Sequence, residues 1–362
     1  MINYSSDEIA VIYLDSFDNL EYKHKKAIFD FVKSPKEILK DFSTVENYAE
    51  KNLNANISKT LKLGNNKDYI EYILNGLENK NTEVITLYSE KYPEDLKNTG
   101  FPPLALYCMG NRELLNARRK IGIVGSRKTL PFYLCKTEEI AHELTKNGIT
   151  VVTGLAEGGD RAAINGSIES GNVISVQAGG LDNIYPESNI NIFKKITKNG
   201  LAVSEHKNDV IPVKYLFPVR NRIIAGLSEG VFIVSGSRKS GARHTADYAL
   251  EYGRDVYAFP YSPGTSSGEL PNSLIKNGAK LIENADDVFD ALMIERPEET
   301  EDIPLSAEQQ AVYTAIRNGN DHIDKIIIET GMKIYEVMPI LTALELKGII
   351  VKEVGNTYGI LK

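Results

Sequence analysis

The sequence is poor in cysteine, since Cys108 and Cys135 are the only two among 362 residues and lie in unrelated contexts. This excludes a disulfide framework and a cysteine-based metal site, and we expect two reduced thiols. The chain also lacks an apolar run of about 18 residues, the length that a membrane-spanning helix needs. Residues 1–10 show no signal-peptide pattern. We therefore expect a cytoplasmic protein that does not contact a membrane.

Motifs of common catalytic and cofactor sites are missing as well. The sequence contains no HExxH zinc motif, no GxSxG nucleophile elbow, no GxGxxG dinucleotide fingerprint and no Walker A loop. Glu205 and Asp160 could act as general bases in principle. However, lone carboxylates at strand ends more often hold the backbone by hydrogen bonds. We therefore expect neither catalysis nor a bound cofactor or metal ion.

The net charge of −7 argues at first against a polyanionic ligand, but the acidic residues are unevenly distributed. Residues 283–308 contain ten acidic side chains and one basic side chain, Arg296, so the rest of the chain carries a charge of +2. Such an acidic run is typical of a solvated linker between domains. The charge distribution is therefore compatible with a nucleic-acid ligand elsewhere in the chain.

The spacing of apolar residues changes along the chain. Residues 1–75 have helical spacing and almost no glycine, which predicts a small helical domain. From Lys120 onward, short β-branched runs alternate with helix-length segments. Continuous apolar strands that alternate with helices are typical of a parallel sheet covered on both faces. We therefore predict an α/β fold with a Rossmann-like, doubly wound, mostly parallel sheet.

The regions before and after this sheet have patterns of their own. Residues 76–119 contain the prolines of GFPPLALYCMG, which predict an extended lead-in packed onto the sheet domain. Residues 305–362 contain three helix-length segments and then IIVKEVGNTYGILK, which predicts a hairpin turning at Gly355-Asn356. Three helices and a hairpin indicate a winged helix. The predicted domains are residues 1–75 (helical), 76–295 (Rossmann-like), 296–304 (acidic linker) and 305–362 (winged helix).

The role of the winged helix is open from the sequence. Its third helix, residues 334–346, could be a DNA-recognition helix. However, the only basic residues near it are Lys333 and Lys347, at its two edges. A protein-contact role or a merely structural role fits this segment at least as well.

In a doubly wound sheet, ligands bind beyond the carboxyl ends of the strands, where loops lead into helix N-termini. The first such loop consists of Gly125, Ser126, Arg127 and Lys128, before a helix that we expect to begin near Pro131. Backbone N–H groups, a hydroxyl and two cations at a helix start favour an anion site. The alternative is a tight turn with a charged exit.

Two further loops at this edge are rich in glycine. TGLAEGGDRAA, residues 153–163, brings Gly154 and two later glycines to a strand-to-helix turn. There Asp160 could cap the helix or contact a ligand. AGGLDNIYP, residues 178–186, follows the next strand, and we expect it to support the cleft more than to bind directly.

The most informative segment is FPVRNRIIAGLS, residues 217–228, in which RNR directly precedes an apolar stretch. Arginine presents a planar fork of donors that matches phosphate oxygens, and Phe217 offers a flat face for a base. GSRKSGARHTA, residues 236–246, adds a second cationic helix start. Several adjacent phosphate sites suit a polynucleotide better than a single cofactor.

We therefore predict one wide basic groove. Its candidate residues are Gly125, Ser126, Arg127, Lys128, Gly154, Lys214, Phe217, Arg220, Asn221, Arg222, Ser240, Gly241 and Arg243. Arg243 could strengthen phosphate binding or pair with Asp247, four residues on. Arg220 and Arg222 could brace the loops, so we expect direct contact from Lys214 and Phe217 first.

Together these motifs resemble the DNA-processing protein A family, also called DprA or Smf. The matching strings, in order between residues 125 and 282, are GSRK, GLAxGxD, GGLDxIYP, FPxRNRIIAGLS, SGxxxTAxxALExGRxVxAxP and NxLIxxGAxLI. The regions before and after these strings resemble the family less specifically. They correspond to a SAM-like helical domain before the sheet and a winged helix after it.

The resemblance implies a non-enzymatic protein that binds single-stranded DNA. Members of the family usually act as homodimers and help to load the RecA recombinase onto that strand during natural transformation. Carried over by motif, Arg127 and Lys214 would each hold a phosphate, and Phe217 would lie close to a base or sugar. Arg220, Asn221, Arg222 and the Ser240-Gly241 turn would complete the groove.

An alternative interpretation is a nucleotide-processing enzyme, such as a phosphoribohydrolase, that uses the same Rossmann-like cleft. That chemistry needs a carboxylate facing the glycosidic bond, normally within a PGGxGT-type motif, which the sequence lacks. A dinucleotide-dependent oxidoreductase is disfavoured because the fingerprint and the ribose-binding acid are both missing.

Overall fold

The computed structural model describes residues 3–17, 20–53, 55–64, 67–294, 305–353 and 355–360. The chain divides into two compact units, residues 1–295 and 296–362. The predicted acidic linker, residues 296–304, lies outside the described residues. None of the described helices is both long and apolar enough to cross a membrane.

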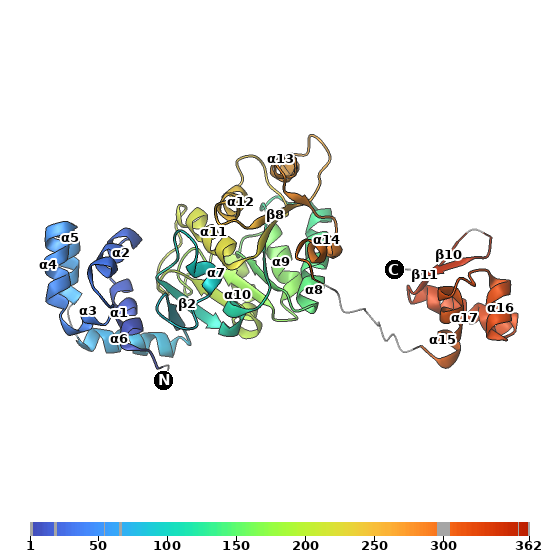
Figure 1. The fold of residues 1–362 in the computed structure, drawn as a ribbon, viewed down its shortest axis with the longest axis horizontal. Helices are drawn as coiled ribbons and strands as arrows, with labels where there is room; N and C mark the ends of the chain where they lie inside the picture. The colour runs from blue at the N-terminus through green and yellow to red at the C-terminus, as the bar shows by residue number, and fades with distance from the viewer. Residues whose placement is uncertain are drawn as a thin grey trace. The chain divides into compact units, whose positions relative to one another are not determined.

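A nine-stranded sheet forms the centre of the first unit, in the order β1-β2-β6-β5-β4-β3-β7-β8-β9 (Figure 1). The strands are β1 (Glu83–Thr86), β2 (Ala105–Gly110), β3 (Lys120–Val124), β4 (Thr150–Thr153), β5 (Val173–Val176), β6 (Leu201–Ser204), β7 (Gly230–Ile233), β8 (Asp255–Ala258) and β9 (Lys280–Leu281). Strands β3 to β9 pair in parallel. The predicted mostly parallel α/β fold is therefore confirmed.

Helices cover both faces of the sheet, which explains why its central strands are mostly apolar and are buried along their whole length. Along β4, Val151 packs on the side of α8 and Val152 on the side of α11. The helices of this region are α7 (Glu94–Lys97), α8 (Pro131–Lys146), α9 (Gly159–Ser167), α10 (Ile190–Asn199), α11 (Leu216–Leu227), α12 (Ala242–Glu251), α13 (Glu269–Lys276) and α14 (Ala285–Ala291), with short 3-10 turns η1 (Arg112–Asn116), η2 (Glu187–Asn189) and η3 (Ser266–Gly268).

The lead-in segment contributes more than the extended chain that its prolines predict. Its strands β1 and β2 pair antiparallel with each other, and β2 pairs antiparallel with β6. The segment therefore forms one edge of the sheet. Only the four-residue helix α7 lies between these two strands, so the alternation of strands with long helices that marks the parallel strands is missing here.

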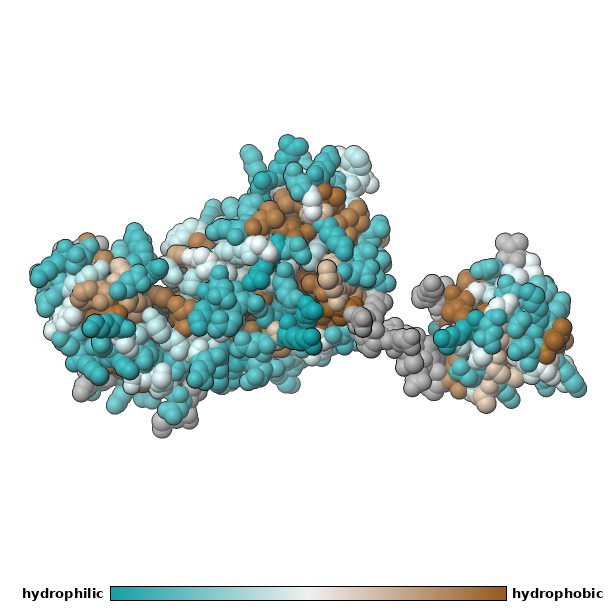
Figure 2. Space-filling model, viewed as in Figure 1, coloured by the Kyte–Doolittle hydropathy of each residue, from teal (hydrophilic) through white to brown (hydrophobic). Residues whose placement is uncertain are grey.

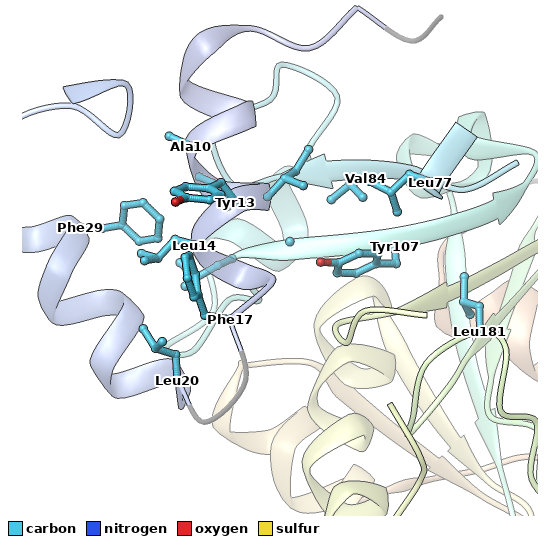
Figure 3. Packing of buried hydrophobic residues seen from close by; sticks show 14 of the residues in the cluster. Ala10, Tyr13, Leu14, Phe17, Leu20, Phe29, Leu77, Val84, Tyr107 and Leu181 are labelled. Atoms are coloured by element: carbon cyan, nitrogen blue, oxygen red, sulfur yellow. The ribbon is translucent and has the colours of Figure 1, made fainter. Parts of the chain in front are cut away.

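In the described part of residues 1–82, six helices precede the sheet: α1 (Ser6–Asp15), α2 (Tyr22–Phe31), α3 (Glu37–Lys40), α4 (Phe42–Asn52), α5 (Ala55–Gly64) and α6 (Lys67–Asn79). They share a core with the antiparallel edge, and Figure 3 shows Tyr13 and Leu14 of α1 within it, together with Phe17 just after the helix. Tyr107 Oη of β2 donates a hydrogen bond to Asp15 of α1 (2.8 Å). The predicted boundary at residue 75 falls inside α6.

The second unit consists of α15 (Ala307–Arg317), α16 (Ile323–Thr330), α17 (Ile334–Leu346) and the antiparallel strands β10 (Ile350–Lys352) and β11 (Tyr358–Ile360). Gly355 and Asn356 have φ angles of 81° and 61°, the left-handed conformation that a tight hairpin turn requires. The predicted winged-helix pattern and its turn are confirmed.

Candidate functional site

Loops that follow β3, β4, β5, β6 and β7 converge at the carboxyl edge of the parallel strands. They enclose a groove of about 850 Å³. The predicted residues that line it are Gly125, Ser126, Arg127, Lys128, Lys214, Phe217, Arg220, Asn221, Ser240 and Gly241. Gly154, Arg222 and Arg243 do not line it.

Hydrogen bonds inside the protein hold the loop after β3. Gly125 N donates to Asp160 Oδ1 (3.2 Å). Ser126 N donates to Ser235 Oγ (2.9 Å), and Ser126 Oγ accepts from Lys128 N (3.1 Å). These three N–H groups are therefore engaged, which differs from the expected backbone anion site at the start of α8. The loop presents two exposed cationic side chains to the groove.

Buried Arg220 and Asp160 form the floor of the groove. Arg220 Nη1 donates to the carbonyl of Val176 at the end of β5, and Asp160 accepts from Ala156 N (3.4 Å). Burial raises the pKa of Asp160 above its ordinary value, whereas the nearby Arg220 guanidinium acts in the opposite direction. This arrangement favours a bracing role for Arg220. Asp160 lies within the first turn of α9, whose N-cap is Gly158, so the suggested capping role is wrong.

Asn221 connects the floor to the loop before α12. Its Nδ2 donates to the carbonyl of Gly241 (3.2 Å), while its Oδ1 accepts from Arg220 Nε (3.1 Å). The amide therefore links two segments of the groove that are 20 residues apart in sequence.

Arg222 lies outside the groove, which corrects its expected place. Its side chain is only 2% exposed, donates to the carbonyl of Phe101 (2.8 Å) and pairs with Glu205. Its Cζ lies 4.7 Å from the centre of the Phe101 ring. Successive residues of a helix turn by about 100°, so side chains two positions apart point in nearly opposite directions. The ion pair also engages Glu205, which the sequence suggested as a possible base.

Glycines allow the loops beneath the groove to approach each other. A Cβ on Gly154 would collide with the Asp160 carboxylate and the Arg220 guanidinium. Gly158 has a φ of +82°, and a Cβ there would collide with the carbonyl of Ser126. Gly154 is therefore needed for the packing of the floor, although it does not line the groove.

Three exposed cations of the groove lack a carboxylate partner. Within the described residues, Arg127, Lys128 and Lys214 form no ion pair. Arg243, in contrast, lies beside Asp247, with 3.7 Å between Nε and Oδ2. Of the two roles that the sequence left open for Arg243, this position matches pairing with Asp247. The three unpaired cations can therefore receive an anionic ligand without breaking an existing pair.

Two aromatic rings accompany these cations. Tyr185, from the loop after β5, is 47% exposed and contacts Phe217 edge to face, with 5.7 Å between ring centres. Arg127 Cζ lies 5.8 Å from the centre of the Tyr185 ring. Sequence reasoning missed Tyr185 as a groove residue. Its place in a glycine-rich loop beyond a strand was the available indication.

The groove combines unpaired cations with an aromatic surface, and its one carboxylate, Asp160, is held in the floor. His244 lines it from the first turn of α12. Among the described residues, no group of three or more His, Cys, Asp or Glu side chains could hold a metal ion. This arrangement suits a ligand with phosphates and planar rings.

Comparisons with known proteins identify the family of the chain. Residues 83–293 match the family model of DNA recombination-mediator protein A, and residues 296–356 match the DprA winged helix domain. DNA processing protein DprA of Bacillus subtilis is 39% identical over 221 residues, which cover 61% of this chain and 74% of that protein.

Two solved structures of similar proteins superpose on the chain. The X-ray structure of DNA processing protein A from Streptococcus pneumoniae gives a TM-score of 0.67 at 26% identity and covers 82% of this chain and 100% of that chain. DNA processing protein A from Helicobacter pylori, studied for its single-stranded DNA binding mode, gives 0.53 at 32% identity, over 58% of this chain and 96% of that chain. The chain therefore belongs to the DNA processing protein A (DprA/Smf) family.

Proposed function

We propose that this protein binds single-stranded DNA in the groove at the carboxyl edge of its sheet. The observation that carries the proposal is the set of unpaired cations, Arg127, Lys128 and Lys214, beside the exposed ring of Tyr185. The Helicobacter pylori relative, for which a single-stranded DNA binding mode is described, supports the same ligand.

The chemistry of the groove favours a single strand over a duplex. Cations neutralise phosphates of either form, but an aromatic ring can stack only on a base that has left its partner. Because Tyr185 and Phe217 offer ring surfaces and every base has a flat face, we expect little sequence preference.

We further propose that the protein acts without catalysis, as a mediator that helps to load RecA onto the bound strand in the cytoplasm. The family description as a recombination mediator supports this role. We also propose a homodimer. Figure 2 shows hydrophobic side chains gathered around α12 and α13. Leu250 of α12 is exposed, and so is Leu281 of β9, the strand that follows α13. A gathered apolar surface is typical of a protein contact.

Gel shifts with single-stranded and duplex oligonucleotides test the central part of this proposal. The parent should prefer the single strand. Arg127→Ala and Lys214→Ala should each weaken binding about tenfold, because each removes a charge-assisted phosphate contact worth about 1.5 kcal/mol.

Lys198→Ala is the matched control, because Lys198 is also exposed but lies at the far end of α10. This control should bind as the parent does. Unchanged affinity in both groove variants would contradict the proposed site, and equal affinity for duplex would contradict the proposed preference.

A further inference from the structure

The order of the strands places most of the cationic side chains in and next to the groove on one side. The first segment on this side is the loop after β3, residues 125–130. The second is the loop after the neighbouring strand β7 together with the start of α12, residues 234–243. They contain five cationic side chains and no carboxylate. The cations are Arg127, Lys128, Arg238, Lys239 and Arg243, and all are exposed.

The opposite side, which follows β5 and β6, contains a short exposed apolar segment. Strand β4 separates these two strands from β3 in the sheet. In the segment 211–215, Ile211 is 70% exposed, Val213 is also exposed, and Tyr215 is 72% exposed. Tyr185 continues this surface from the loop after β5. Exposed apolar side chains concentrated in one short segment indicate a contact surface more strongly than scattered ones do.

This apolar segment is continuous with the groove. Pro212, Val213 and Lys214 line the groove, and Tyr215 directly follows them at the start of α11. Tyr215 itself does not belong to the lining, so its ring extends the surface beyond the groove. A polymer that fills the groove must leave it over one of its rims.

We infer that a single strand lies in the groove with its phosphates along the β3–β7 side and its bases along the β5–β6 side. Tyr215 then stacks on a base outside the groove. This inference rests on the proposed function. It adds to that function which side of the groove the phosphates of the DNA contact and which side its bases contact. Lys214 is the cation that the base side contributes, and it neutralises a phosphate between the stacked bases.

The two sides should respond differently to experiment. A cation that neutralises a phosphate releases a counterion, so removing it lowers the dependence of binding on salt. Stacking releases no counterion, and it requires that a base be present. Binding measurements on single variants can therefore show whether a residue contacts phosphates or bases, without a structure of the complex.

The experiment measures fluorescence anisotropy of two labelled oligonucleotides of equal length, oligothymidylate and an oligonucleotide of abasic sites, at several salt concentrations. Tyr215→Ala should weaken oligothymidylate binding by roughly tenfold and leave its salt dependence unchanged. The same variant should bind the abasic oligonucleotide as the parent does. Tyr215→Phe should keep the parent affinity, because the ring remains.

Lys239→Ala tests the phosphate side. It should reduce the slope of log K against log salt by about 0.7 for both oligonucleotides. Tyr72→Ala is the control for losing an exposed tyrosine, since Tyr72 on α6 is 74% exposed. This control should match the parent.

The inference is overturned if Tyr215→Ala weakens both oligonucleotides equally or neither of them. It is also overturned if Lys239→Ala weakens oligothymidylate alone and leaves the salt slope unchanged. A parent protein that binds neither oligonucleotide contradicts the proposed function itself, which is a different result.

Discussion

Arg220, Asn221 and Arg222 are adjacent in the sequence but make three different kinds of contact. Arg220 braces the floor of the groove, Asn221 holds the loop before α12, and Arg222 pairs with Glu205 outside the groove. Their residue types indicated phosphate binding, but residue type alone does not fix the direction of a side chain. Lys214 and Arg127 are exposed in the groove, where the motif placed them.

Replacing Arg220 by methionine should lower the free energy of unfolding at neutral pH by about 3 kcal/mol, because Asp160 would remain buried without its cation. The folded-state pKa of Asp160 is already raised by burial and would rise further. A raised carboxyl pKa means that the folded state binds the proton more tightly, so the variant should regain stability as pH falls through that pKa.

Urea unfolding at several pH values measures this effect. The double variant Asp160→Asn/Arg220→Met serves as the control, because it removes both charges and should be less destabilised at neutral pH than Arg220→Met alone. A stability difference between Arg220→Met and the parent that does not change with pH would contradict the explanation.

At the scale of elements, the alternation of short apolar runs with helices was enough to predict the central parallel strands. The turn residues Gly355-Asn356 were enough to place the hairpin of the second unit. The antiparallel strands β1 and β2 were not predicted, because pairing across an edge leaves no periodic pattern in so short a segment. Contacts between loops, such as that of Gly158 with Ser126, were not predicted either, because they depend on how the strands are arranged in the folded protein.

Gly158→Ala should destabilise the first unit by about 1–3 kcal/mol, because the new Cβ meets both a positive φ and the carbonyl of Ser126. The displaced loop should also weaken oligonucleotide binding. Gly253→Ala is the matched control, since Gly253 has a φ of +67° and open space around its Cβ position. Urea unfolding should show the larger loss for Gly158→Ala, and equal losses would contradict the role of the loop contact.

At the scale of the whole molecule, each unit has its own apolar core, and the complete groove belongs to the first unit. The helix α17 of the second unit exposes Ile334, Tyr335 and Met338. Its sequence contains no lysine or arginine. These features favour a protein contact over a duplex-reading role for the winged helix.

Residues 1–294 alone should therefore bind single-stranded oligonucleotides with an affinity within about threefold of the whole chain, a difference below 1 kcal/mol. Fluorescence anisotropy of the two proteins with the same oligonucleotide measures this. Circular dichroism is the control that the shortened protein is folded. A loss of tenfold or more in a folded shortened protein would assign part of the binding to the second unit.

Hydrogen–deuterium exchange with and without a single-stranded oligonucleotide tests the central claim most directly, because it reports which backbone segments the ligand protects. We predict slower exchange on binding in residues 125–130, 211–217 and 236–244, the loops and helix starts that surround the groove. Residues 305–353 should exchange as before. Protection confined to the second unit or to the N-terminal helices, with none in these three loops, would contradict the account.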